Sequence, residues 1–524
     1  MAHTTTDAAP SETTGPAEIS RARLITIFIG LLLGILMAAL DQTIVATALP
    51  TIAGDLNGLS QISWIITAYL LAQTAAMPIY GKVGDFIGRK NAFQLAIVIF
   101  LLGSVFAGLA QTMAELIITR AVQGIGAGGL LIGAQTIMAE IVTPRQRAKY
   151  MSVMGPMIGV ATVLGPLLGG FLTEQASWRW IFYINVPVGI ASMIITSRVL
   201  KLPRRSERPR VDWLGIPLML AVVISLILVL TWGGRIYEWS SPVIIGLIVV
   251  VIVLTPLLVW AERRASEPLF PPALFADPVF RINAPLAFLL GLAMFGAVSY
   301  LPTYLQLSLG ASATKSGILM LPLMGGLMLA AIVTGQVISR TGKYRAFPII
   351  GSTLACVGMY LLSLMNADTP REESSLYMIV LGLGIGFIMP TLVLLVQNSV
   401  EHRFMGPATA TVNFARQIGA SAGTALIGSL FVSRLATDLQ QNLPPGAAGK
   451  IGKHAQGIGP EQLATLPPDI AHAFVVSYAE ALTPLYAYVA PALIIGIVLS
   501  LLMKNKPLSS AIGRGPAARA DDRT

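Results

Sequence analysis

Residues 80–91 read YGKVGDFIGRKN, a polar stretch of three glycines, one aspartate and three basic residues between two long apolar runs. The chain has 524 residues, of which 55% are hydrophobic and only 11% charged, whereas soluble domains carry about 25% charged residues. Apolar runs of about 20 residues, the length of a helix that crosses a bilayer, recur along the whole chain. The sequence therefore predicts an integral membrane protein, in which residues 80–91 form a short loop between two spans.

The apolar runs predict fourteen transmembrane helices and an all-α fold. They are too long and too continuous for the alternating strands of a membrane barrel, and a helix satisfies its own backbone hydrogen bonds in lipid. The predicted spans are residues 24–49, 60–79, 91–110, 113–138, 150–173, 180–198, 213–232, 242–260, 282–308, 315–337, 346–366, 375–397, 405–433 and 476–503.

The basic residues predict the orientation of these spans. If both termini are cytoplasmic, most of the 35 lysines and arginines fall in short cytoplasmic loops and tails, as the positive-inside rule requires. The net charge of +10 then reflects the many basic residues of these cytoplasmic loops and tails. A nucleic-acid partner is not expected, because the charge is spread over many loops and is not gathered on one face.

Glycine-rich landmarks recur in the same order at separations of 254, 258 and 254 residues, which predicts two homologous halves. The pairs are Gly81 with Gly335, residues 124–128 (GIGAG) with 382–386 (GLGIG), and Gly165 with Gly419. Transporters use such repeats to open a central site alternately to each side of the membrane. The predicted domains are a disordered tail (1–22), a six-helix bundle (23–198), two additional helices (199–262), a second six-helix bundle (263–503) with an external loop (435–475), and a second tail (504–524).

Five motifs, each in its expected helix, resemble the major facilitator superfamily and in particular its fourteen-helix drug:proton antiporter branch. They are LDQTIVATALPTIAGDL (40–56), GKVGDFIGRK (81–90), RAVQGIGAGG (120–129), GPMIGVATVLGPLLGG (155–170) and SWRWIFYINVPVG (177–189). The resemblance covers nearly the whole chain. It implies a major-facilitator fold of two six-helix bundles plus two extra helices, and proton-coupled efflux of drugs or other amphiphilic small molecules.

The resemblance implies that the 80–91 loop is a latch that holds the two halves together on the cytoplasmic side. Its glycines allow close helix approach, and Asp85 is expected at the N-terminus of the thirteenth span, whose partial positive charge favours an anion. The residues of this gate motif are Gly81, Gly84, Asp85, Gly88, Arg89 and Lys90. The second copy has Ser339 in place of Asp85, which predicts a weaker latch there. The alternative is an ordinary solvated turn.

Asp41 and Arg120 are the candidates for proton coupling. Asp41 lies well inside the first span, where a charge is costly and desolvation favours the neutral form of a carboxyl group. Arg120 opens the fourth span and stays charged; in the family the matching arginine is linked to proton transfer. The sequence places no acid beside Arg120. The alternative for each residue is a purely structural role, which for Asp41 is an ion pair.

The fifth span carries the glycine–proline motif that the family associates with antiporters. Its residues are Gly155, Pro156, Gly159, Gly165, Pro166, Gly169 and Gly170. Small residues of this kind favour close helix–helix contact, and proline kinks a helix. Simple packing explains the glycines in part, and the resemblance adds a hinge or seal between the halves.

The substrate site is expected between the halves, largely apolar with a few polar groups. Candidate lining residues are Phe295, Tyr300, Tyr304, Phe387, Asn413, Arg416 and Gln417. An arginine within a span is a functional candidate by default, and the alternative for Arg416 is an ion pair with Asp41. Because Asp41 is the one deep acid while Glu115, Glu140, Glu174 and Glu480 fall near helix ends, we expect neutral, singly charged or weakly acidic substrates and not dications.

The sequence predicts a secondary transporter and not an enzyme. The four histidines are scattered along the chain, without the spacing of metal ligands. The GIGAG stretch does not follow a predicted strand, as a nucleotide-binding loop does. No cofactor is expected. The expected partners are a small-molecule substrate, protons and membrane lipid, for a monomer in the bacterial cytoplasmic membrane. The alternatives are an uptake carrier or a lipid or metabolite exporter on the same fold, and a membrane sensor or channel.

Overall fold

The computed structural model describes residues 20–58, 61–202, 212–234, 236–311, 313–443, 463, 466–503 and 508. Fourteen helices in this part of the chain are long and apolar enough to cross a membrane, which confirms the predicted number of spans. Both predicted tails lie mostly outside the described residues.

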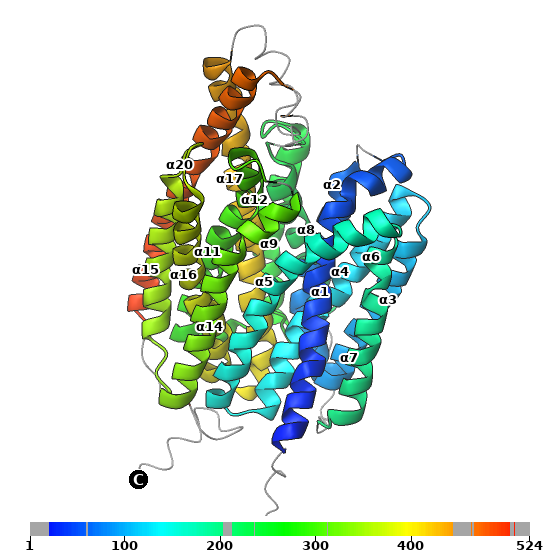
Figure 1. Cartoon of the computed structure of the whole chain (residues 1–524). Helices are drawn as coiled ribbons and strands as arrows, with labels where there is room; N and C mark the ends of the chain where they lie inside the picture. The colour runs from blue at the N-terminus through cyan, green and yellow to red at the C-terminus, as the bar shows by residue number, and fades with distance from the viewer. Residues whose placement is uncertain are drawn as a thin grey trace, which may run out of the picture.

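The first half contains six spans in seven helices. These are α1 (Arg21–Asp55), α2 (Ile62–Ile87), α3 (Arg89–Leu109), α4 (Met113–Ile141), α5 (Pro144–Gln175), and the pair α6 (Trp180–Tyr183) and α7 (Asn185–Val199), which together form one span. The chain then enters two further helices, α8 (Gly215–Trp232) and α9 (Pro242–Arg264). Figure 1 shows the first half on the right of the molecule and the second half on the left.

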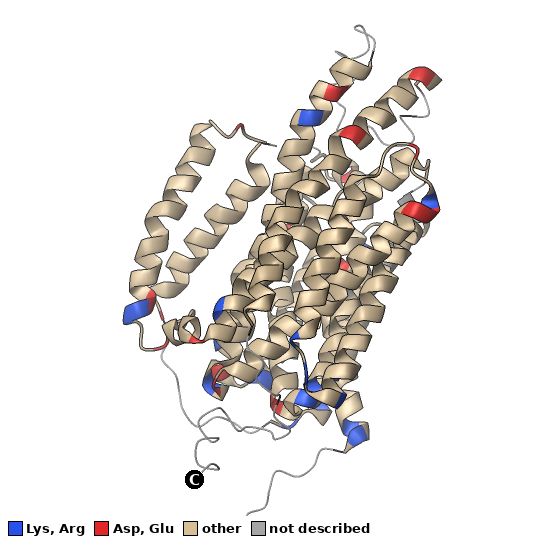
Figure 2. Cartoon of the chain, turned by 90° about the vertical axis from the view of Figure 1, so that its left-hand side faces the viewer, with Lys and Arg blue, Asp and Glu red and all other residues tan. Residues whose placement is uncertain are grey.

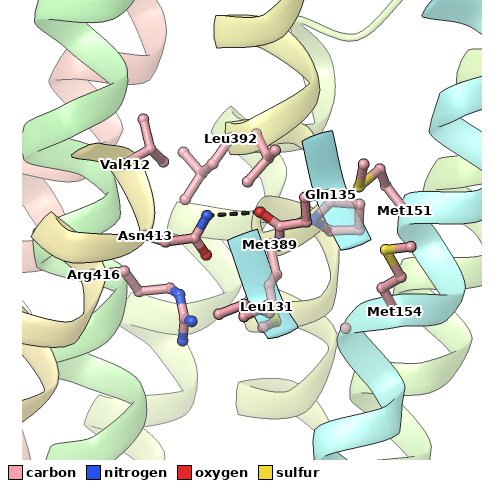
Figure 3. A pocket seen from close by; sticks show the side chains of 12 residues that line it. Leu131, Gln135, Met151, Met154, Met389, Leu392, Val412, Asn413 and Arg416 are labelled. Carbon is pink, nitrogen blue, oxygen red and sulfur yellow. Dashed lines mark hydrogen bonds between the residues drawn. The ribbon is translucent and has the colours of Figure 1, made fainter. Parts of the chain in front are cut away.

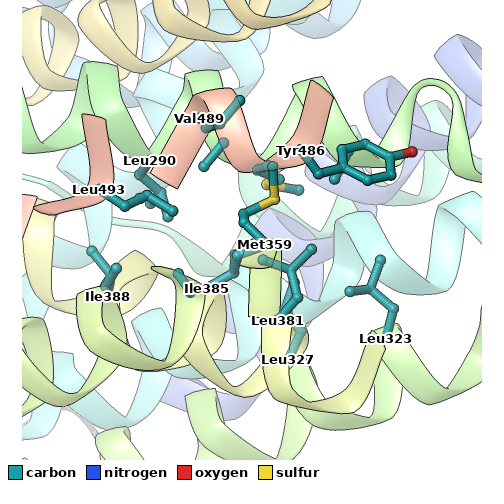
Figure 4. Close-up of a cluster of buried hydrophobic side chains, with 14 of the residues drawn as sticks. Leu290, Leu323, Leu327, Met359, Leu381, Ile385, Ile388, Tyr486, Val489 and Leu493 are labelled. Atoms are coloured by element: carbon teal, nitrogen blue, oxygen red, sulfur yellow. The ribbon is translucent and has the colours of Figure 1, made fainter. Parts of the chain in front are cut away.

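The second half also contains six spans. Its helices are α10 (Pro272–Ala276), α11 (Pro278–Val298), α12 (Leu301–Ser308), α13 (Ala313–Leu319), α14 (Leu321–Thr341), α15 (Ala346–Ser363), α16 (Arg371–Ser399), the 3-10 turn η2 (His402–Phe404), α17 (Met405–Asn442) and α20 (Pro468–Leu501). An apolar core joins α11, α14, α15, α16 and α20, and Figure 4 shows its central part around Met359 and Ile385.

The predicted external loop over 435–475 is wrong at both ends. α17 continues to Asn442 and α20 begins at Pro468, so both helices project beyond the other spans (Figure 1). Hydropathy marks only the apolar part of a helix, while the polar turns that follow it, such as Asp438–Asn442, remain compatible with helix in water. Residues 444–462 of this segment lie outside the described residues.

The repeated glycine motifs occupy equivalent places in the two halves. In α4, Gly124 and Gly128 face backbone atoms of α2, while the glycine between them, Gly126, faces α3. In α16, the outer glycines of residues 382–386 face α14 and the central Gly384 faces α15. The internal repeat read from the sequence is therefore a repeat of helix packing, with α14, α15 and α16 as counterparts of α2, α3 and α4.

The third landmark pair follows the same pattern. A methyl group on Gly165 of α5 would lie 2.1 Å from Thr43 Oγ1 of α1, and one on Gly419 of α17 would lie 2.0 Å from the Phe288 carbonyl oxygen of α11. Only glycine permits such close approach. α11 and α17 are thus the counterparts of α1 and α5.

The two halves meet through these same counterparts. Gly81 of α2 lies against Gly406 and Ala410 of α17, and Gly335 of α14 lies against Ser152 of α5. Each half therefore packs its second span against the fifth span of the other half. Figure 1 shows the second of these contacts, with α5 and α14 side by side near the middle of the molecule.

Lysine and arginine gather at one end of the described structure, which we call the basic end (the lower end in Figure 2). The α2–α3 turn and the α14–α15 turn both lie there. Most basic residues of the short loops thus share one side of the helix bundle, as the positive-inside pattern requires.

Candidate transport site

The first polar cluster surrounds Asp41, in the interior of the first half. Arg120 Nη1 of α4 donates a hydrogen bond to Asp41 Oδ2 and forms an ion pair with it. The Oδ1 atom accepts hydrogen bonds from Gln123 Nε2 at 3.0 Å and from Asn185 Nδ2 at 2.9 Å. Three N–H donors from three different side chains therefore surround the carboxyl group of Asp41.

Arg120 makes further contacts within the same cluster. Its Nε donates to the Ile65 carbonyl oxygen at 3.3 Å, and its guanidinium lies 4.3 Å from the centre of the Tyr69 ring. The exposed fraction is 1% for Arg120 and 0% for Asp41. The predicted coupling residues are therefore direct partners within one half, and the partner of Arg120 that sequence reasoning missed is Asp41 itself.

The gate motif lies at the basic end, where α2 meets α17. Asp85 is buried and its Oδ2 lies 3.7 Å from the position of a methyl group on Gly406, in the first turn of α17. The prediction that residues 80–91 form a loop is wrong, because α2 continues to Ile87 and α3 begins at Arg89. Only Gly88 separates the two helices, with a φ of +88° that is accessible to glycine. The carboxyl group thus lies beside the helix N-terminus where the resemblance expects it.

Arg89 connects the gate motif to α4. Its Nε forms an ion pair with Glu140 Oε1 at 3.1 Å, and its Nη1 donates to the Thr136 carbonyl oxygen at 2.9 Å. Lys90 instead donates to the Ser197 carbonyl oxygen at 2.6 Å, within the first half. Glu140 was noted in the sequence only as an acid near a helix end, and no motif marked it as a partner.

A second set of polar contacts crosses between the halves above the basic end. Asn413 Nδ2 of α17 donates to Gln135 Oε1 of α4 at 2.7 Å, and Gln397 Nε2 of α16 donates to the Gln135 carbonyl oxygen at 3.3 Å. Arg147 of α5 donates to Gln397 Oε1 at 3.2 Å. All four side chains are buried. Of these residues only Asn413 was a candidate from the sequence, because isolated glutamines carry no recognisable pattern.

The antiporter motif of α5 faces two different surfaces. Methyl groups on Gly155 and Gly159 would meet the sulfur atoms of Met389 (3.3 Å) and Met324 (2.8 Å) from the second half. Gly165 and Gly169 instead pack against α1, while a methyl group on Gly170 would contact nothing within 4 Å. Pro156 and Pro166 both lie inside the helix.

A cavity of about 40 Å³ lies between the halves, next to Gly155. Its lining residues come from α4, α5, α16 and α17: Leu131, Gln135, Met151, Met154, Gly155, Met389, Pro390, Leu392, Val393, Val412, Asn413 and Arg416. Figure 3 shows Asn413 and Arg416 on α17 opposite the two methionines of α5. This volume holds a few water molecules and is well below the roughly 300 Å³ of a ligand pocket, so the cavity as described is too small for a drug-sized ligand.

The remaining substrate candidates do not line this cavity in the described conformation. The Tyr300 hydroxyl donates to the Thr424 carbonyl oxygen at 3.1 Å, and the Tyr304 hydroxyl donates to the Asn366 carbonyl oxygen at 2.6 Å. Phe295 and Phe387 pack against the apolar core of the second half, and Gln417 is buried on α17 but is not among the residues that line the cavity. Their role in substrate binding stays a prediction.

The fold and the cavity between two related halves define a membrane transporter, and not an enzyme. The chain belongs to the Major Facilitator Superfamily, whose family model matches residues 31–213 and 211–424. It is therefore a multi-pass membrane protein of that superfamily.

Several relatives share this architecture. An uncharacterized MFS-type transporter of Mycobacterium tuberculosis is 42% identical over 495 residues, covering 94% of this chain and 72% of the relative. Multidrug resistance protein 3 of Bacillus subtilis is 36% identical over 478 residues (90% and 93%). The solved structure of the proton:xylose symporter XylE superposes with a TM-score of 0.61 at 14% identity, covering 93% of this chain and 98% of XylE. That structural likeness concerns the fold alone.

Proposed function

We propose that the protein exports hydrophobic or amphiphilic small molecules, such as drugs, antibiotics or natural products, in exchange for protons. Relatives from Bacillus subtilis that carry the names multidrug transporter protein MdtP and Multidrug resistance protein 3 are each 36% identical to it. The largely apolar lining of the cavity suits substrates of this kind. The observation that carries the coupling to protons is the buried ion pair between Asp41 and Arg120.

In the proposed mechanism the halves rock about the cavity, which opens alternately to each side of the membrane. The contacts of α2 with α17 and of α14 with α5 close the basic end and separate when that end opens. Protonation of Asp41 removes the negative charge that Arg120 faces, and the two side chains then part. Loading and release of this proton alternate with movement of the substrate.

The proposal places the protein as a monomer in the bacterial cytoplasmic membrane, with the basic end and both termini in the cytoplasm. The gathering of Lys and Arg at one end (Figure 2) supports this orientation under the positive-inside rule. An uptake carrier and an exporter of lipids or metabolites are the alternatives on this fold.

Transport in inside-out vesicles tests the proposal. A panel of toxic compounds that are more harmful to a deletion strain supplies the substrate, and an imposed pH gradient supplies the driving force. We expect accumulation inside the vesicles, and its loss in Asp41→Asn. Asp368→Asn, at an exposed position in the α15–α16 connection, is the matched control. Gradient-driven transport that persists in Asp41→Asn would show that Asp41 does not couple transport to protons. Accumulation only in right-side-out vesicles would favour the uptake carrier.

A further inference from the structure

We propose that Arg416 is the receptor for a single anionic group of the substrate, so that the cavity takes organic monoanions with an apolar body. This inference rests on the proposed function and narrows its substrate class. It concerns the one basic side chain among the residues that line the cavity between the halves.

Arg416 lies deep in the membrane. It is eleven residues from the start of α17 at the basic end, which at 1.5 Å per residue is about 16 Å along the helix axis. The hydrocarbon core of a bilayer is about 30 Å thick, so the side chain lies near its middle. Its exposed fraction is only 6%.

The charge of Arg416 has no counter-charge among the described residues. Its guanidinium makes no hydrogen bond or ion pair in that part of the chain, and no acidic residue lines the cavity. Asp41, which the sequence offered as an alternative partner, is bound to Arg120, Gln123 and Asn185. A guanidinium does not lose its proton in proteins, and an unpaired buried charge is costly. A mobile ligand that enters the cavity can supply this negative charge.

The rest of the lining determines what kind of anion fits. Apart from Arg416, Asn413 and Gln135, the cavity is lined by aliphatic side chains, three methionines, a proline and a glycine. Asn413 uses its NH2 group on Gln135 Oε1 and the Thr409 carbonyl oxygen (2.9 Å). Its amide oxygen remains as an acceptor for a hydroxyl of the ligand. One anionic group on an apolar body matches these surroundings better than a hydrated inorganic ion.

The same lining explains how this small cavity widens. Met151 and Met154 of α5 and Met389 of α16 face the space from opposite halves (Figure 3). Methionine side chains are flexible and polarizable, and they repack around ligands of different shape. Separation of α5 from α16 therefore enlarges the cavity next to Arg416 between flexible apolar side chains.

Binding to the purified full-length protein in detergent micelles tests the inference with three probes of one shape: 2-naphthoate, 2-naphthamide and 2-naphthylmethylammonium. We expect the naphthoate to bind at least about tenfold more tightly than the amide, because one charge-assisted hydrogen bond contributes a difference in affinity of about this size. Arg416→Gln should abolish this preference and Arg416→Lys should retain most of it. Arg434→Gln, a half-buried arginine near the other end of the same helix and outside the cavity lining, is the control and should leave the preference unchanged.

Three results would overturn the inference. They are tighter binding of the ammonium probe than of the naphthoate, an unchanged preference in Arg416→Gln, and no naphthoate binding up to its solubility limit. Chloride and phosphate are titrated as competitors of naphthoate. If they bind as tightly as naphthoate, the site is one for inorganic ions. Because these measurements use binding alone and the proposed function is tested by transport in vesicles, failure of this inference would leave the proposed function intact.

Discussion

Gly406 of α17 lies directly against Gly81 of α2, so that a methyl group on Gly406 would come within 2.2 Å of the Gly81 carbonyl oxygen. This contact joins the two halves at the basic end, beside the buried Asp85. A side chain at either position forces the helices apart. The close contact of α2 with α17 at the basic end therefore depends on the absence of two Cβ atoms.

The first prediction is that Gly406→Ala opens the basic end. Overpacking costs about 1–3 kcal/mol, which shifts the balance between closed and open forms by about 5- to 150-fold. A cysteine in place of Met151 in the cavity, with Cys356 replaced by serine, reports opening through its rate of alkylation. Gly246→Ala is the control, because a methyl group there contacts nothing within 4 Å. An unchanged alkylation rate in Gly406→Ala would show that this contact does not close the gate.

The second prediction concerns the energetic coupling of Asp41 and Arg120. Asp41→Asn and Arg120→Gln should each lower the free energy of unfolding by about 3–5 kcal/mol, because each leaves a buried charge without its partner. The double variant should lose less than the sum of the two, which is the signature of a direct interaction. Denaturant unfolding in mixed micelles measures all four proteins. Additive losses would contradict the ion pair.

The third prediction is that Gln397→Leu loosens the contact between α5 and α16. The substitution removes the acceptor of Arg147 and a donor to Gln135. An unsatisfied buried polar group costs about 1–3 kcal/mol, so backbone amides in the first turns of α5 should exchange their hydrogens faster. Exchange followed by mass spectrometry checks this, with the amides of α15 as an internal reference. Equal protection in both proteins would rule out a structural role for Gln397.

The fourth prediction uses the internal repeat. Gly126 and Gly384 occupy equivalent positions, and a methyl group would lie 2.6 Å from the Phe100 nitrogen in the first case and 2.3 Å from the Ala355 nitrogen in the second. Both Gly→Ala variants should therefore lower the thermal unfolding temperature by similar amounts. Gly170→Ala, where space is open, should leave it unchanged. A loss confined to one half would mean that the halves are packed differently.

Much of this architecture could be predicted from the sequence, because apolar runs report membrane spans whatever their tertiary partners are. The number of spans and the repeat follow from local patterns, whereas the position of Asp85 near α17 is expected from the family resemblance of its motif. The pairing of Arg120 with Asp41 does not follow from such patterns, because the two residues are 79 positions apart. They lie on different helices, and the sequence does not determine which side of each helix faces the other. The same holds for Gln135 and Asn413, which are separated by 278 positions.

The α8–α9 pair breaks the symmetry of the two halves at their lipid-facing surface. Met219 and Val223 of α8 pack with Ala75 of α2 and Phe414 of α17, so that α8 covers the seam where α2 meets α17. The equivalent seam between α14 and α5 has no such cover in the described part of the chain, and large apolar side chains such as Leu329 and Phe171 lie exposed on these two helices. The surrounding lipid therefore meets an additional helix on one flank of the transporter and only α5 and α14 on the other, so the two flanks differ although the halves are related.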